Sequence, residues 1–192
     1  MSSSYRVLAL ALHVIFVLVT CTYVSEATFF PPACPPPPPP PQNKTATFYL
    51  QFVIANGTNN AVANGIPVAG IQGTNFGLQQ FGTVYVFDVN ITTTTSPTST
   101  LLGQSYGTLE VTGLKGFIYL VTSTYVFSSG EFAGSTLTTQ GVFDMSQQVS
   151  YFAVVGGTNA LTYATGYVAY QIVVNAPPYF VIQVTANFKL AA

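Results

Sequence analysis

"ATFYLQFVI", residues 46–54, alternates apolar and mixed side chains with a period of two. Phe48, Leu50, Phe52 and Ile54 fall on one face of an extended chain, and the residues between them fall on the other face. This alternation is typical of a half-buried β-strand. We therefore expect a sheet protein with one face built from aromatic and aliphatic side chains.

The same period recurs to the end of the chain, as at 81–89, 117–127 and 180–188. Turns rich in Gly, Asn and Pro separate these runs, and no segment has convincing helical spacing. Eight or nine antiparallel strands favour an all-β barrel or sandwich. Further strands are predicted near residues 66–72, 100–112, 134–143, 149–155 and 163–174.

The N-terminal segment has a different character from the rest. A short region with one positive charge precedes an apolar run at 7–19, and "SEA" at 25–27 places small residues at a cleavage site. The run is too short to span a bilayer but suits a signal-peptide core. We predict a secretory signal peptide at 1–27, export from the cell, and no membrane attachment after cleavage.

Residues 28–45 form a Pro-rich segment between this signal and the domain at 46–192. The prolines from Pro35 to Pro41 favour a stiff polyproline II arm, which serves as a linker or as a wall-binding tail. Three N-x-[ST] sequons follow the signal, at Asn43, Asn56 and Asn90. They predict a secreted glycoprotein.

Composition excludes several classes of function. Only 5% of the residues are charged and Lys and Arg total 4, so no basic surface for nucleic acid is expected. Removal of residues 1–27 leaves no His, no Arg and one thiol, Cys34. The remaining chain therefore lacks the His base of a catalytic triad and the His and Cys cluster of a zinc site. We expect no metal, no cofactor and no catalytic residue. An interior that binds a neutral ligand and one filled by side chains both remain open.

Four stretches carry a resemblance to plant dirigent proteins, and the resemblance extends from about Phe48 to Phe188, essentially the whole predicted domain. They occur in the family's order and spacing. "GEFAGSTL" and the "VVGGT" that precedes "ATGY" are the most specific parts. The stretches are "NFGLQQFGTVYVFDVNIT" (75–92), "LLGQSYGTLEV" (101–111), "YVFSSGEFAGSTLTTQG" (125–141) and "FAVVGGTNALTYATGYVAY" (152–170).

The resemblance implies an eight-stranded antiparallel β-barrel in the apoplast and a homo-oligomer, a trimer or a dimer. It also implies that the protein binds phenolic, monolignol-type radicals and guides their stereoselective coupling in lignan or related biosynthesis. A separate laccase or peroxidase would make the radicals, so no independent catalytic activity is expected. Candidates for the pocket or its mouth are Phe52, Asp88, Tyr106, Phe127, Gly156, Gly157, Thr158 and Thr165. We predict that Gly156 and Gly157 serve a hairpin turn.

The chain departs from the pattern of pinoresinol-forming members at two of these positions. Phe52 stands where they carry an acidic residue, and Thr165 stands where they carry an arginine. The partner of the N-terminal cysteine is also absent, which leaves Cys34 unpaired. Two alternatives stay open: a structural cell-wall glycoprotein, and an enzyme of the allene oxide cyclase type, which shares the barrel architecture.

Overall fold

The computed structural model describes residues 42–55, 61–71, 80–115 and 117–190. These residues form strands and one turn of 3-10 helix, η1 (Asn159–Leu161). The expected period of two is visible in the burial pattern, as in β5, where every second residue is buried. The strands are β1 (Gln42–Val53), β2 (Gly65–Ala69), β3 (Val84–Thr92), β4 (Leu101–Val111), β5 (Ile118–Phe127), β6 (Thr136–Asp144), β7 (Ser150–Gly157), β8 (Thr165–Ala176) and β9 (Tyr179–Leu190).

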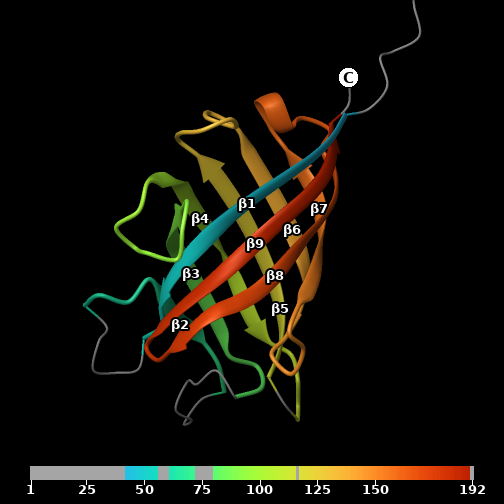
Figure 1. Cartoon of the computed structure of the whole chain (residues 1–192). Helices are drawn as coiled ribbons and strands as arrows, with labels where there is room; N and C mark the ends of the chain where they lie inside the picture. The colour runs from blue at the N-terminus through green and yellow to red at the C-terminus, as the bar shows by residue number, and fades with distance from the viewer. Residues whose placement is uncertain (1–41, 56–60, 72–79, 116, 191–192) are drawn as a thin grey trace, which may run out of the picture. The chain divides into compact units, whose positions relative to one another are not determined.

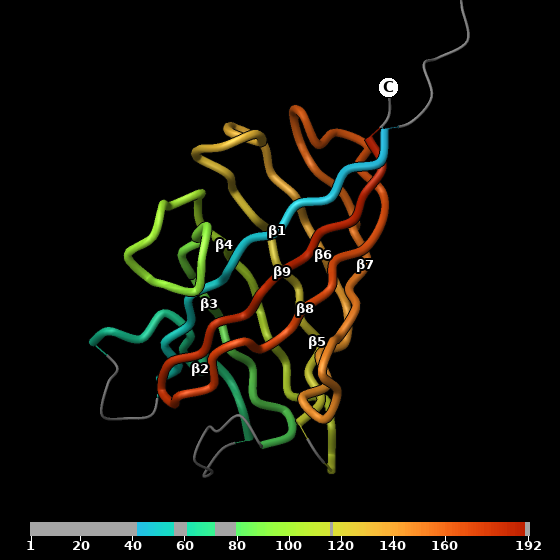
Figure 2. Tube along the Cα trace, in the orientation of Figure 1, coloured from blue at the N-terminus to red at the C-terminus, as the bar shows by residue number. Residues whose placement is uncertain are grey.

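The strands form a closed eight-stranded antiparallel barrel, which confirms the predicted fold. Neighbours follow the order β1-β9-β8-β7-β6-β5-β4-β3, and β1 also pairs with β3, which closes the cylinder. β1 and β9 cross the barrel wall side by side over their full lengths (Figure 1, Figure 2). Closure leaves no exposed sheet edge between these eight strands.

The short strand β2 lies at the seam where the barrel closes. β1 pairs with only the last three residues of β3, from Asn90 to Thr92, while β2 pairs with its first four, from Val84 to Phe87. Asn64, just before β2, spans the remaining gap. Its Oδ1 accepts from the Val53 amide at 2.7 Å, and its Nδ2 donates to the Gln51 carbonyl at 2.8 Å. The side chain thereby takes the place of a missing piece of strand.

One half of the barrel interior is filled by aromatic side chains. Phe48 packs edge-on against Tyr125 at 5.0 Å and against Phe127 at 5.6 Å between ring centroids. Phe132, from the loop after β5, continues this contact to Phe188 at 5.7 Å. We call this the closed end of the barrel; the turn at η1 lies there too.

β7 and β8 form the predicted antiparallel hairpin, but the double glycine does not make its turn. Gly156 and Gly157 are the last residues of β7 and pair with Thr138 and Leu137 of β6, so they are not in the turn. The turn is made by η1, with left-handed backbone at Asn159 (φ 52°) and Tyr163 (φ 62°). Asn tolerates this conformation better than most residues.

Several predicted features lie in residues that the structure does not describe, or at the boundary of the described residues. The signal peptide, most of the Pro-rich arm, Cys34 and Asn56 lie outside them. β1 begins at Gln42, so residues 42–45, assigned above to the arm, are part of the barrel wall. Within the part of the chain that the structure describes, no helix is long and apolar enough to cross a membrane.

Candidate functional site

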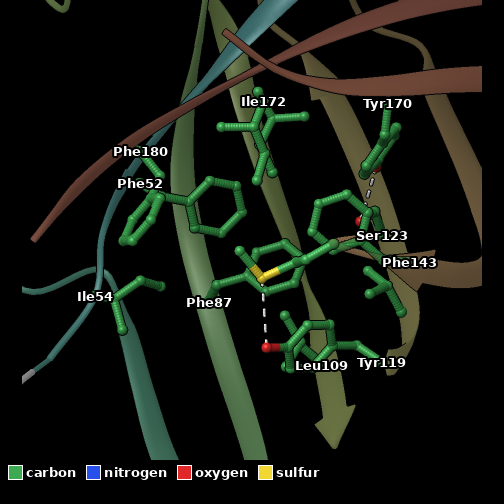
Figure 3. Close-up of a pocket in the computed structure, with 13 residues that line it drawn as sticks. Phe52, Ile54, Phe87, Leu109, Tyr119, Ser123, Phe143, Tyr170, Ile172 and Phe180 are labelled. Atoms are coloured by element: carbon green, nitrogen blue, oxygen red, sulfur yellow. Dashed lines mark hydrogen bonds between the residues drawn. The ribbon is translucent and has the colours of Figure 1, made fainter. Parts of the chain in front are cut away.

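A partly open cavity of about 60 Å³ occupies the half of the barrel opposite the closed end. A buried water needs about 10–15 Å³ by this measure, so the space exceeds that of a single water. The close-up shows the side chains that surround it (Figure 3). They are Phe52, Ile54, Phe87, Leu109, Tyr119, Val121, Ser123, Phe143, Met145, Tyr170, Ile172, Phe180 and Ile182.

The wall of the cavity is aromatic and uncharged. Phe52 of β1 meets Phe87 of β3 edge-to-face at 5.2 Å, and Phe143 of β6 lies 6.5 Å from Tyr170 of β8. Among the described side chains that surround the cavity, none is ionised at neutral pH. Such a wall favours flat, neutral, apolar molecules, because an ion would lose its hydration without gaining a partner.

Hydroxyl groups interrupt this apolar wall on the side formed by β5 and β8. The Tyr170 hydroxyl donates to Ser123 Oγ at 3.2 Å and also contacts the Tyr125 hydroxyl. The Tyr125 hydroxyl lies 3.4 Å from Thr139 Oγ1. On another part of the wall, the Tyr119 hydroxyl donates to Met145 sulfur at 3.4 Å (Figure 3).

Burial keeps these tyrosines neutral. Burial raises the pKa of Tyr125 well above its usual value, and the neighbouring Tyr170 raises it further. Burial also raises the pKa of Tyr170 and of Tyr119, the latter with a smaller contribution from Tyr85. A hydroxyl with a raised pKa stays protonated in neutral solution. These groups can therefore form hydrogen bonds but are poorly suited to act as general bases.

The structure brings Phe52 to the cavity and places the other predicted positions elsewhere. Asp88 and Tyr106 are paired neighbours on the outer face of β3 and β4, and Tyr106 is 41% exposed. The Tyr106 hydroxyl donates to Gln104 Oε1 at 2.6 Å. Phe127 is inside the barrel, but it belongs to the aromatic packing of the closed end.

The predicted positions near the double glycine also lie at the closed end. The Thr158 hydroxyl accepts from the Thr136 amide at 3.1 Å, beside the end of β7. Thr165 is exposed and pairs with Lys189 near the end of β9, whereas Phe52 pairs with Phe180 near its start. Phe52 and Thr165, the two departures from the family pattern, are therefore far apart along the barrel wall.

The cavity also contains residues that the sequence analysis did not select, above all Ser123 and Tyr170. Both have the inward parity of their strands: Ser123 follows Tyr119 and Val121 at steps of two, and Tyr170 follows Val168. A serine in the inward phase of a strand is a signal that could have drawn attention to Ser123, although Ser105 of β4 shares it without lining the cavity. Among the described residues, no three His, Cys, Asp or Glu side chains gather closely enough to hold a metal ion.

The fold and the cavity define a small antiparallel β-barrel with an apolar interior cavity. A family model, Dirigent-like protein, matches residues 44–188. The chain belongs to the dirigent family, which confirms the resemblance seen in the sequence.

Two relatives show how far the similarity extends. Dirigent protein 1 of Arabidopsis thaliana is 32% identical over 62% of this chain, and the match spans 64% of the relative, less than two thirds of its length. Pterocarpan synthase 1 of Glycine max is 28% identical over 87% of this chain and 86% of the relative. A solved pterocarpan synthase dirigent protein has the same fold, with a TM-score of 0.69 and 24% identity over 79% of this chain and 90% of its own.

Proposed function

We propose that this protein binds neutral phenolic radicals in the cavity and guides their stereoselective coupling, as a step of lignan or related phenylpropanoid synthesis. A separate laccase or peroxidase supplies the radicals by one-electron oxidation of the phenol. Two radicals then form one carbon–carbon bond, and the protein takes no electrons itself. The observation that carries the proposal is the uncharged, aromatic wall of the cavity inside a dirigent-family barrel.

Such a wall contributes to coupling by holding the bound radical in a defined position and orientation. Aromatic rings at 5–7 Å from one another, such as Phe52, Phe87, Phe143 and Tyr170, offer faces and edges to a flat guest. A radical held with one face exposed at the open mouth can meet a second radical in a restricted set of orientations. Restricting orientation is sufficient to select one product, since radical coupling itself needs no acid or base.

The direct test is coupling of coniferyl alcohol by a laccase with and without the protein. We expect an enantiomeric or regioisomeric excess in at least one dimer when the protein is present. Because Phe52 replaces an acidic residue of pinoresinol-forming members, we expect pinoresinol itself to stay racemic. Identical product mixtures with and without the protein, for coniferyl alcohol and for other monolignols, would contradict the proposal.

A pterocarpan-forming activity is the second candidate. It is favoured by the relative named pterocarpan synthase, whose match extends over 87% of this chain, farther than that of the dirigent relative described above. The two candidates differ in their need for an oxidase, because radical formation removes an electron from the phenol, whereas closing an ether ring from a hydroxylated precursor forms one C–O bond, releases water and needs no oxidant. Conversion of a phenolic pterocarpan precursor by the protein alone would support the second candidate, and dependence on laccase would support the first.

The proposed setting is the apoplast, with the protein as a glycosylated homo-oligomer, a trimer or a dimer. Asn43 and Asn90 both have exposed side chains in strands, which leaves room for a glycan. Mass spectrometry of the secreted protein should find an N-terminus near Thr28 and a mass that falls on enzymatic deglycosylation. A wall-bound fraction that depends on residues 31–41 would instead favour the structural cell-wall role.

A further inference from the structure

Four hydroxyl groups form a row that ends at the wall of the cavity. Ser123 accepts from Tyr170, Tyr170 contacts Tyr125, and Tyr125 contacts Thr139. All four side chains are at least nine-tenths buried, with Ser123 only 1% exposed. Ser123 and Tyr170 belong to the cavity wall, whereas Tyr125 and Thr139 lie behind them.

The Ser123 hydroxyl is the member of the row whose hydrogen can turn toward the cavity, because Ser123 lines the cavity wall. Since Tyr170 donates to Ser123, the Ser123 hydrogen is not used in that contact. The Tyr125 hydroxyl is also within hydrogen-bonding reach of Ser123, so an acceptor oxygen in the cavity competes with Tyr125 for this hydrogen. A ligand without such an oxygen leaves the Ser123 hydroxyl bonded within the row.

We propose that Ser123 donates a hydrogen bond to an acceptor oxygen of the bound ligand. The ligand class is then a neutral aromatic molecule with a carbonyl, ether or hydroxyl oxygen on the part that enters the cavity. This inference rests on the proposed function in that it takes the cavity as the phenol site. An anionic ligand is disfavoured, because the described residues that line the cavity include no cation.

Ser105 provides a matched control for Ser123. It is a serine on the neighbouring strand β4, it is fully buried, and its Oγ has no hydrogen-bond partner among the described residues. Unlike Ser123, it does not line the cavity. A change at Ser105 therefore alters the barrel interior to a similar extent without altering the proposed ligand contact.

The experiment compares two small ligands that differ in one oxygen, propiophenone and propylbenzene. Each is titrated against the fluorescence of N-phenyl-1-naphthylamine bound to the protein. We expect Ser123→Ala to weaken propiophenone binding about fivefold to tenfold, the loss of about one neutral hydrogen bond, and to leave propylbenzene binding within about twofold. Ser123→Thr, which keeps the hydroxyl, should restore the affinity for the ketone, and Ser105→Ala should change neither affinity.

A second measurement needs no variant and so does not depend on the folding of Ser123→Ala. The carbonyl stretch of ¹³C-labelled propiophenone should fall in frequency on binding to the wild-type protein, relative to the ketone in hexane. An unshifted carbonyl band, equal losses for both ligands in Ser123→Ala, or failure of both ligands to displace the probe would each overturn the proposal. Because no oxidase is present, these results are independent of whether the protein guides radical coupling.

Discussion

Single polar side chains affect the stability of this barrel in both directions: one closes the seam with hydrogen bonds, and two others bury hydroxyl groups without a described partner. Asn64 completes the seam between β1 and β3 with two side-chain hydrogen bonds to the backbone of β1. Its own amide donates to the Val53 carbonyl, and its carbonyl accepts from the Asp88 amide. By contrast, Thr83 and Ser105 bury hydroxyl oxygens with no partner among the described residues.

Asn64→Ala should destabilise the barrel, because it leaves a backbone donor and a backbone acceptor of β1 unpaired at a partly buried seam. We expect the free energy of unfolding to fall by about 2–3 kcal/mol, measured by urea denaturation. Asn175→Ala is the control, since Asn175 is exposed in β8 and has no described side-chain hydrogen bond. Equal losses in the two variants would show that Asn64 does not close the seam.

Thr83→Val should stabilise the protein. Valine has nearly the shape of threonine, so the change removes an unsatisfied buried oxygen without opening a hole. We expect a gain of about 1 kcal/mol in the free energy of unfolding, and Ser105→Ala should change stability in the same direction by a smaller amount. A loss of stability in Thr83→Val would mean that its hydroxyl has a bound water as partner.

At the scale of elements, most strands were predictable because they have one buried face; β2, in which only Gly65 is buried, is the exception. The run at 117–127 shows the strict period of two in sequence and in burial, and β5 occupies 118–127. What the sequence could not show is the role of a residue that breaks a pattern. The double glycine suggested a turn. In the structure, Gly157 instead lies between the backbone of η1 and the backbone of β6, close to the Leu161 and Thr136 carbonyl oxygens, and the sequence does not show this close approach.

Gly157→Ala and Gly156→Ala should therefore behave differently although the residues are adjacent. A Cβ at Gly157 would meet the Leu161 carbonyl oxygen at 2.5 Å and the Thr136 carbonyl oxygen at 2.7 Å, while one at Gly156 would meet nothing within 4 Å. We expect Gly157→Ala to lower the melting temperature by several degrees, a cost of about 2 kcal/mol, and Gly156→Ala to be nearly neutral. Similar melting temperatures for the two variants would contradict this assignment of the glycines.

At the scale of the whole molecule, the barrel divides into a closed end and a cavity end. The sequence shows which residues point inward, as with Phe52, because parity is a local property of a strand. Which inward residues meet depends on the stagger of the strands, which only the assembled barrel reveals. Phe127 and Phe52 are both inward, yet one packs in the closed end and the other lines the cavity. Asp88 and Thr165 are a different case, because both have the outward parity of their strands, which the sequence pattern already contains.

The buried tyrosines give the whole barrel a characteristic response to alkaline pH. An unfolded tyrosine ionises near pH 10.0, whereas burial raises the pKa of Tyr125 and Tyr170 above that value in the folded protein. Above pH 10 the unfolded chain therefore binds fewer protons than the folded chain, and the free energy of unfolding falls as the pH rises. Below pH 10 these groups are neutral in both states and leave the stability unchanged.

Melting temperatures recorded between pH 8 and pH 12 check this expectation. The wild-type protein should lose stability steeply above pH 10, and Tyr125→Phe should show a shallower decline, because one ionisable group has left the buried pair. Tyr151→Phe, at a side chain that is 64% exposed, should keep the wild-type slope. If Tyr125→Phe and Tyr151→Phe decline in parallel with the wild type, then alkaline unfolding begins elsewhere in the barrel, and the hydroxyl row behind the cavity is not what limits its stability.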